Sequence, residues 1–185
     1  QLGTPISSLI AWIEILHENY PGDDMIPEME KDVKRLELIA DRFSKIGSLP
    51  EPQPLSLNCD ISNVVDYIDR RTSSAVLMTV NMPNHDVVVR INASLFEWVI
   101  ENLCKNAIDA TEGRGHIEIT AKEEHDRFVI EISDTGKGIA KNKFKSIFEP
   151  GYTTKKRGWG LGLSLAKRIV EKYHKGKIFV KTSEI

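Results

Sequence analysis

Apolar residues in the first part of the chain recur at alternating steps of four and three positions. The two series are Leu2, Ile6, Leu9, Ile13 and Leu16, and then Ile26, Met29, Val33, Leu36, Ala40 and Phe43. This spacing places each series along one narrow stripe of a helix, as at the a and d positions of a heptad. The intervening Tyr20–Asp24 contains a proline, a glycine and two aspartates, which favour a turn. Residues 1–46 are therefore predicted to form a helical hairpin.

Two helices joined by a short turn cannot bury both apolar stripes by themselves. Pairing of two hairpins into a four-helix bundle would bury them, so the pattern favours a homodimer. The alternative is that the hairpin packs on the rest of its own chain. The narrow and sustained stripe favours the dimer.

A proline-rich segment, Gly47–Pro54, follows the hairpin and favours neither helix nor strand. We expect a linker over residues 47–56 and a second domain over residues 57–185. Helices are predicted over residues 60–71 (with Asp60 as its cap), 93–110 and 161–173, and strands over residues 76–81, 86–91, 116–122, 127–133 and 177–181. This order predicts an α+β chain, in which the hairpin is followed by a two-layer α/β sandwich.

Composition narrows the class of protein. Of 185 residues, 28% are charged and the formal net charge is −2, which argues against a nucleic-acid-binding surface spread over the whole protein. No apolar run reaches the roughly 18 residues that a membrane-spanning helix needs. The two cysteines and five histidines lack the spacing of a disulfide framework or a metal site. We therefore expect a cytoplasmic protein.

The helix predicted over residues 93–110 carries two amides within its apolar pattern. Asn102 and Asn106 are four residues apart, so both side chains project from one face. Amides at such positions need partners, and amide oxygens are hard ligands that suit Mg²⁺ and hence nucleotide phosphates. The alternative is that both amides bond to neighbouring backbone, and this segment alone does not separate the two.

A second polar segment directly follows the strand predicted over residues 127–133. Asp134 precedes Gly136 and Gly138, which could form a tight turn and nothing more. The carboxylate could also accept a hydrogen bond from the exocyclic amine of adenine, while the glycines let the backbone approach the ligand closely. Guanine offers a carbonyl at that position, so such a carboxylate would select adenine.

Two further segments complete the pattern. Phe144, Ile147 and Phe148 form a small apolar cluster before a Pro-Gly turn, and residues 153–157 then supply hydroxyls and cations. The simpler interpretation of the latter is a solvated basic loop. The glycines that follow open the helix predicted over residues 161–173, where exposed N–H groups make a phosphate site, although neither a P-loop nor a dinucleotide fingerprint is present.

In this order, the four segments resemble the N, G1, F and G2 boxes of the histidine kinase ATPase domain, whose superfamily includes gyrase B, Hsp90 and MutL. The resemblance covers about Leu57 to the end. The opening Gln1–Pro5 also resembles the kinase segment that follows the phosphoacceptor histidine, which the family writes H-E-x-x-T-P. This second similarity extends the resemblance across the hairpin.

The resemblance implies roles for individual residues. Asn106 would ligate Mg²⁺, Asn102 would support the phosphates, Asp134 would accept from the adenine amine, and Lys155 would reach the phosphates. The implied catalytic residues are Gln1, Thr4, Asn102 and Lys155. The other implied nucleotide contacts are Lys105, Asp109, Gly136, Gly138, Ile139, Phe148, Thr153, Thr154, Gly158, Gly160, Leu161, Gly162 and Leu163.

The resemblance also implies an activity: ATP-dependent phosphorylation of a histidine, followed by relay to an aspartate of a response regulator. ATP and Mg²⁺ are the expected cofactors, and a response-regulator receiver domain and a second copy of the chain are the expected partners. The expected location is the cytoplasm, including as the cytoplasmic part of a membrane-anchored sensor. The implied acceptor histidine immediately precedes Gln1, so we expect a hairpin that is truncated at its N-terminus and a chain without its own acceptor.

The sequence departs from the family pattern at two further points. Gln1 stands where the family usually has an acidic residue, and the chain ends before the last strand of the family fold. One alternative is therefore an ATP-binding module of the same superfamily without kinase activity, and another is a purely structural dimerisation protein. The heptad hairpin and Thr4-Pro5 favour the kinase, because a gyrase-like ATPase typically places an acidic residue where Asn102 stands. A purely structural protein would not need four nucleotide segments in order.

Overall fold

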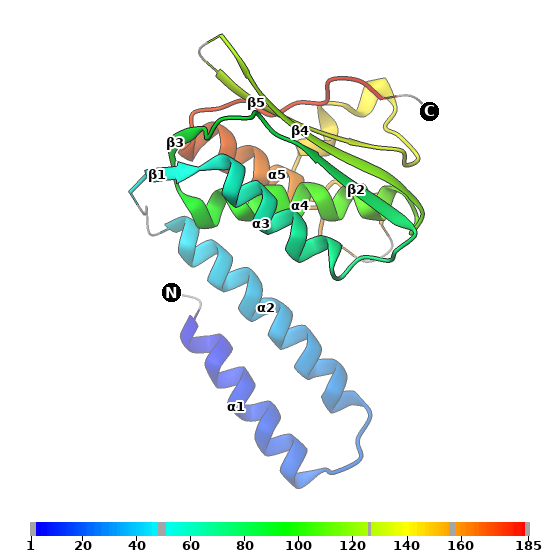
Figure 1. Cartoon of the computed structure of the whole chain (residues 1–185). Helices are drawn as coiled ribbons and strands as arrows, with labels where there is room; N and C mark the ends of the chain where they lie inside the picture. The colour runs from blue at the N-terminus through cyan, green and yellow to red at the C-terminus, as the bar shows by residue number, and fades with distance from the viewer. Residues whose placement is uncertain (1–2, 48–50, 126, 156–157, 184–185) are drawn as a thin grey trace. The chain divides into compact units, whose positions relative to one another are not determined.

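The computed structural model describes residues 3–47, 51–125, 127–155 and 158–183. By its internal contacts, the chain divides into two compact units, Gln1–Pro50 and Glu51–Ile185 (Figure 1). Among the described residues, no helix combines the length and the apolar character needed to cross a membrane.

The first unit consists of two antiparallel helices where the apolar pattern predicts them. Helix α1 (Gly3–Asn19) and helix α2 (Met25–Gly47) lie side by side, joined by a turn in which the Asp23 carboxylate accepts a hydrogen bond from the first amide of α2 at 2.8 Å (Figure 1). The buried residues between them are Ile6, Ile13, Ile26 and Val33. Of the other predicted stripe residues, Leu2 and the side chain of Phe43 lie outside the described part of the chain.

The second unit contains two small sheets. Strands β2 (Val76–Asn81), β4 (Gly115–Glu124) and β5 (Arg127–Asp134) form one sheet in the order β2-β4-β5, with β2 parallel and β5 antiparallel to β4. Strands β1 (Gln53–Ser56) and β3 (Val88–Ile91) pair antiparallel in the other, with Leu55 opposite Val89. Strands 76–81 and 86–91 of the sequence prediction therefore form, but they belong to different sheets.

Strand β1 corrects the prediction that Gly47–Pro54 favours neither helix nor strand. A proline is tolerated in an edge strand, because a missing N–H there leaves no internal ladder position open. Both strands of a two-stranded sheet are edges, so Pro54 fits opposite Arg90. Leu55 packs against the main core, which fixes the strand on the second unit.

Three helices cover one face of the three-stranded sheet (Figure 1). They are α3 (Leu57–Asp69), α4 (Ala93–Ala110) and α5 (Gly162–Arg168), and α5 continues into a π-helical turn, Ile169–Tyr173. Helix α4 contacts both α3 and α5. The core between helices and sheet includes Ile61, Ile100, Cys104, Ile117 and Ile119, all fully buried. This arrangement confirms the two-layer α/β sandwich.

Helix α3 begins one turn earlier than predicted. Its cap is Ser56, whose Oγ accepts from the amide of Cys59, and not Asp60. Asp60 instead lies inside the helix, where burial raises the pKa of its carboxyl group. Cys104 is fully buried in the core, and this burial raises the pKa of its thiol to about 12.

The predicted strand over residues 177–181 is not formed. The segment keeps the expected alternation, with Ile178 and Val180 half-buried and the residues beside them exposed. A strand also needs a ladder of backbone hydrogen bonds, and within described residues 175–183 the segment is attached differently. Lys181 bonds to the Glu131 carboxylate at 2.8 and 3.0 Å, and the Ser183 hydroxyl accepts from the Ile139 amide at 2.7 Å.

Candidate functional site

The polar side of α4 combines two amides and a carboxylate. Asn102, Asn106 and Asp109 are spaced by four and three residues and therefore share one face of the helix. Asn106 is half-buried and Asp109 is exposed. The Nδ2 group of Asn102 is buried and has no hydrogen-bond partner among the described residues. Because buried polar groups in folded proteins are almost always paired, this amide is a group for which a ligand would supply the partner.

A lysine from a distant loop reaches this face. The Lys155 ammonium donates to Oδ1 of Asn106 at 2.8 Å and lies 2.5 Å from Oδ2 of Asp109. The hydroxyl of Thr153 accepts from the Lys155 amide at 3.1 Å and shapes the turn that carries the lysine. Lys155 thus contacts two residues of α4 that precede it by 49 and 46 positions in the sequence.

The start of α5 packs against the same helix face. A Cβ atom at Gly162 would collide with Oδ1 of Asn102, so any other residue there would force the Asn102 side chain to move. At Gly160 the backbone has φ +64°, and a side chain there would meet the backbone of Gly151 and Tyr152. The Gly151 amide donates to the Gly160 carbonyl at 3.1 Å, which closes the base of the loop. Sequence reasoning missed this role of Gly151, although the Pro-Gly pair signals the turn.

The turn after β5 rests on the end of α4. The Asp134 carboxylate is exposed and accepts from the Gly136 amide at 2.9 Å. A Cβ at Gly136 would lie 2.5 Å from the carbonyl carbon of Ala110, and the Lys137 amide donates to the Ala110 carbonyl at 3.1 Å. The segment that carries the predicted base-reading carboxylate is thereby fixed to the helix that carries the amides.

The remaining predicted residues fall into several groups. Gly138 and Ile139 continue the turn after Asp134, and Thr153 and Thr154 are exposed beside Lys155. Gly158 is exposed ahead of α5, whereas Leu161 and Leu163 are half-buried at the start of that helix. Lys105 is paired with Glu101 on α4, and the Phe148 ring lies 5.6 Å from the Lys167 ammonium. Gln1 and the side chain of Thr4 lie outside the described part of the chain.

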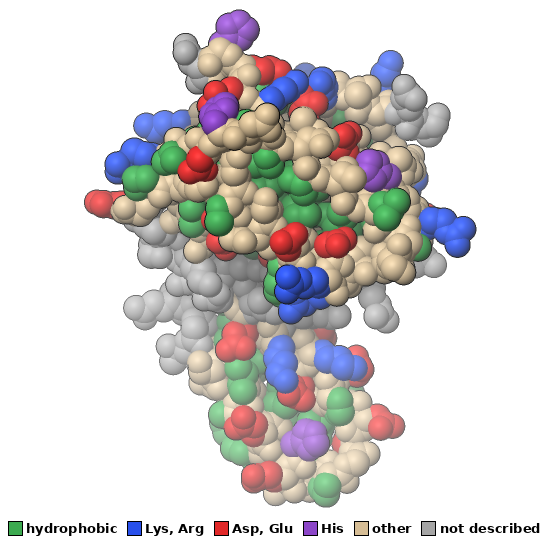
Figure 2. All heavy atoms as spheres, viewed as in Figure 1, with side chains coloured by type: hydrophobic (Ala, Val, Ile, Leu, Met, Phe, Trp, Pro, Cys, Tyr) green, Lys and Arg blue, Asp and Glu red, His purple; other side chains and the backbone are tan. Residues whose placement is uncertain are grey.

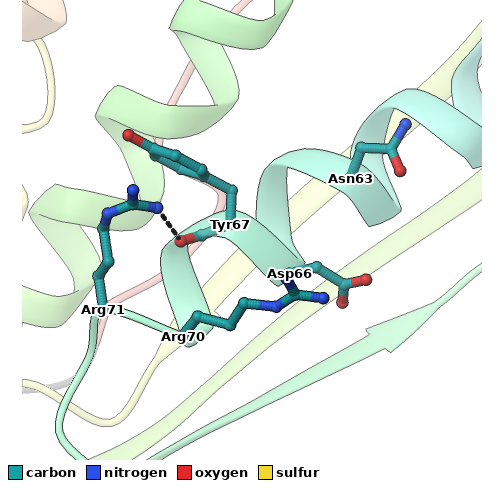
Figure 3. Close-up of a pocket in the computed structure, with 5 residues that line it drawn as sticks. All are labelled: Asn63, Asp66, Tyr67, Arg70 and Arg71. Atoms are coloured by element: carbon teal, nitrogen blue, oxygen red, sulfur yellow. Dashed lines mark hydrogen bonds between the residues drawn. The ribbon is translucent and has the colours of Figure 1, made fainter.

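Surface pockets occur elsewhere on the second unit. One of about 660 Å³ is lined by side chains on α3 and just beyond it, where the Arg71 guanidinium stacks 3.7 Å from the Tyr67 ring centre (Figure 3). An adjoining pocket of about 330 Å³ includes Glu97, whose pKa is raised by burial and by the nearby Asp60 and Glu101 carboxylates. Neither pocket is lined by a predicted site residue.

Sequence comparison relates the part of the chain that contains this site to a known family. Residues 91–184 match the family described as histidine kinase-, DNA gyrase B-, and HSP90-like ATPase. The sensor histidine kinase ZraS of Salmonella typhimurium is 31% identical over 196 residues, a match that covers all of this chain but only 41% of ZraS. This chain therefore spans less than half the length of that relative.

Solved structures show the same fold. The catalytic domain of the histidine kinase ThkA superposes with a TM-score of 0.68 at 30% identity, covering 73% of this chain and 90% of that domain. ThkA in complex with the response regulator protein TrrA superposes with a TM-score of 0.68 at 23% identity, over 98% of this chain and 56% of ThkA. The family match spans half of the sequence and contains Asn102, Asp134 and Lys155. The chain therefore belongs to the family of histidine kinase-, DNA gyrase B- and HSP90-like ATPases.

Proposed function

We propose that this chain is the ATP-binding catalytic portion of a sensor histidine kinase, with most of its dimerisation hairpin attached. It transfers the γ-phosphoryl group of ATP to a histidine, from which the group passes to an aspartate of a response regulator. The observation that carries the proposal is the cluster of Asn102, Asn106, Asp109 and Lys155, assembled from two distant segments. The alignment of ZraS along the whole chain and the ThkA complex with TrrA support the kinase activity and the regulator as partner.

The residues of the cluster fit a nucleotide with a divalent cation. Within the part of the chain that the structure describes, the buried amide of Asn102 has no partner, and Gly162 leaves room beside it that a side chain would fill. The Lys155 ammonium contacts the oxygens of Asn106 and Asp109, which supports the proposal that a cation binds here. We assign Asn106 as the Mg²⁺ ligand and Lys155 as the residue that reaches the phosphates.

Phosphoryl transfer depends mainly on positioning and charge neutralisation. Bound Mg²⁺ would neutralise charge on the phosphate oxygens. Asn102 would orient the phosphates through its amide, and the backbone at Gly158, Gly160 and Gly162 would approach them closely. Because phosphoryl transfer consumes ATP, we propose that this unit works in the cytoplasm.

The base is assigned to the turn after β5. Asp134 would accept from the exocyclic amine of adenine, and Gly136 and Gly138 would let the backbone lie close to the ring. The Gly136 amide already bonds to Oδ1 of Asp134, which fixes the orientation of the carboxylate. The other implied contacts, including Ile139 and Phe148, belong to the same proposal.

ATP is expected to bind at least about tenfold more tightly than GTP, and Asp134→Asn should weaken ATP binding by a similar factor. A site built to hydrogen-bond one group disfavours analogues that leave its partner unpaired. Competition of each nucleotide with a fluorescent ATP analogue measures both effects. Asp66→Asn on α3 is the control, because it removes the same charge at a distant pocket. Equal competition by GTP and ATP would show that Asp134 does not read the base.

We further propose that the first unit forms a homodimer through a four-helix bundle. Within the hairpin, Ile6, Ile13, Ile26 and Val33 are buried, yet the alternate stripe positions Leu9, Met29 and Leu36 remain 43%, 44% and 41% exposed. Figure 2 shows apolar side chains at the surface of this unit. Four stripe residues are thus used inside the hairpin, and these three exposed ones are available to a second hairpin.

Sedimentation equilibrium tests the bundle. The intact chain is expected to be a dimer, and the double substitution Met29→Glu with Leu36→Glu should weaken the dimer more than about tenfold, because two carboxylates per chain would lose water in the interface. Met25→Glu is the control, since Met25 is 70% exposed and lies outside the stripe. A monomeric wild type, or a double variant that dimerises equally well, would rule out the bundle.

The acceptor is proposed to be a histidine directly upstream of Gln1, as the similarity of Gln1–Pro5 to H-E-x-x-T-P implies. A general base acts by accepting a proton, which a neutral glutamine does far less readily than a carboxylate. We therefore expect Gln1 to support slower transfer than glutamate at the same position.

A further inference from the structure

We propose that Lys155 acts as a built-in counter-cation that occupies the proposed metal position when nucleotide is absent, and that Asp109 is the positioning residue that keeps it there. The inference rests on the proposed function of the site. It adds that one lysine has two successive sets of partners: first the oxygens of α4, and then the phosphates. Mg²⁺ and the lysine would compete for the same oxygens.

The geometry supports competition between Lys155 and Mg²⁺ for the same oxygens. The ammonium group lies 2.8 Å from Oδ1 of Asn106 and 2.5 Å from Oδ2 of Asp109. An amide oxygen and a carboxylate oxygen one turn apart are also the hard ligands that Mg²⁺ prefers. An ammonium group is a compact point charge with three donors, so it can satisfy both oxygens at once. A second cation at the same oxygens would be repelled at short range, so the two occupants exclude each other.

Asp109 has a distinct part in this arrangement. Asn106 is neutral and offers the lysine only a hydrogen bond, whereas Asp109 adds an ion pair. The loop that carries the lysine is already closed at its base by the backbone hydrogen bond between Gly151 and Gly160. The contact of Lys155 with Asp109 fixes the loop at a second point, on α4.

The contact between Lys155 and Asp109 is weak enough for a ligand to displace it. The side chains of Lys155 and Asp109 are 39% and 55% exposed. Exposed ion pairs contribute little to stability, which corresponds to a factor of about two to five in an equilibrium constant. The contact therefore biases the loop toward α4 without preventing exchange for a better-charged ligand.

Hydrogen exchange of the full chain, without nucleotide or Mg²⁺, tests the inference. Asp109→Asn is expected to speed exchange of the amides of residues 151–155 about two- to five-fold, because the loop opens more often. Lys155→Met should give at least that increase, because it also loses the hydrogen bond to Asn106, and the double variant should add nothing beyond Lys155→Met. Asp109→Glu should restore slow exchange. Glu30→Gln is the control, because it breaks a lysine pair that is also 2.5 Å long, in the other unit.

The outcomes separate this inference from the proposed function. Unchanged exchange in Asp109→Asn, or additive effects in the double variant, would overturn the inference. Titration of the wild type with Mg²⁺ and ATP is the parallel measurement. If the wild type binds ATP but the exchange rates do not change as expected, the proposed function stands and only the inference about Lys155 falls. If the wild type does not bind ATP, both the proposed function and the inference lose their basis.

Discussion

Replacing Asn106 with alanine is expected to abolish the Mg²⁺-dependent part of ATP binding. The substitution removes the amide oxygen that we assign to the metal. Mg²⁺ demands near-octahedral geometry and is bound in such sites by few protein ligands, so a lost oxygen is not easily replaced. The affinity gained on adding Mg²⁺ should therefore fall at least about tenfold, on the scale of a lost hydrogen bond to a charged group.

Calorimetric titration with ATP, in Mg²⁺ and in a chelator, measures this gain directly. The difference between the two conditions separates the metal-dependent part of ATP binding from nucleotide contacts that do not involve Mg²⁺. Asn63→Ala is a matched control, since it removes an exposed amide from α3 at a distance from the site. An unchanged gain in Asn106→Ala would show that the metal is held elsewhere.

Much of the fold could be predicted because local pattern and tertiary packing agree. Helix α4 has the predicted bounds, since its apolar positions recur with helical spacing and Asn92 caps it through the Leu95 amide at 2.9 Å. The same holds for α1 and α2, whose stripe residues pack against each other. In these elements the residues that favour the local structure are the residues that the core buries.

Other elements depend on partners that periodicity does not reveal. Strand β1 contains Pro54 and forms because β3 supplies an edge to pair with. Residues 177–181 have the alternation of a strand yet make no ladder with β5 in the described structure. The start of α3 depends on Ser56, a weaker signal than the acidic Asp60 one turn later.

Some features of the candidate site could likewise be predicted from the sequence, and others could not. The glycines and the paired amides are visible in the sequence because each reflects a local requirement, such as the approach of Gly162 to Asn102. The ion pair between Lys155 and Asp109 joins residues 46 positions apart and exists only once the loop folds onto α4. Sequence spacing alone cannot show such a contact.

The largest effect is expected in phosphoryl transfer itself. A nucleophile must be held in line with the γ-phosphate, and positioning supplies most of the acceleration. None of the five histidines of this chain lies in the H-E-x-x-T-P context, and His17 lies in the last turn of α1, far along the helix from Thr4. We therefore expect this chain to bind ATP without labelling itself, while a chain extended upstream with the natural sequence becomes phosphorylated.

Incubation of both chains with γ-labelled ATP tests whether the proposed kinase phosphorylates a histidine upstream of Gln1. We expect label on the extended chain alone, with the acid lability and alkali stability of a phosphorus–nitrogen bond. Asn106→Ala should abolish the label, and Gln1→Glu should speed its uptake. An extended chain that binds ATP but takes up no label would instead indicate an ATP-binding module without kinase activity. Stable histidine labelling of the 185-residue chain would contradict the position that we assign to the acceptor.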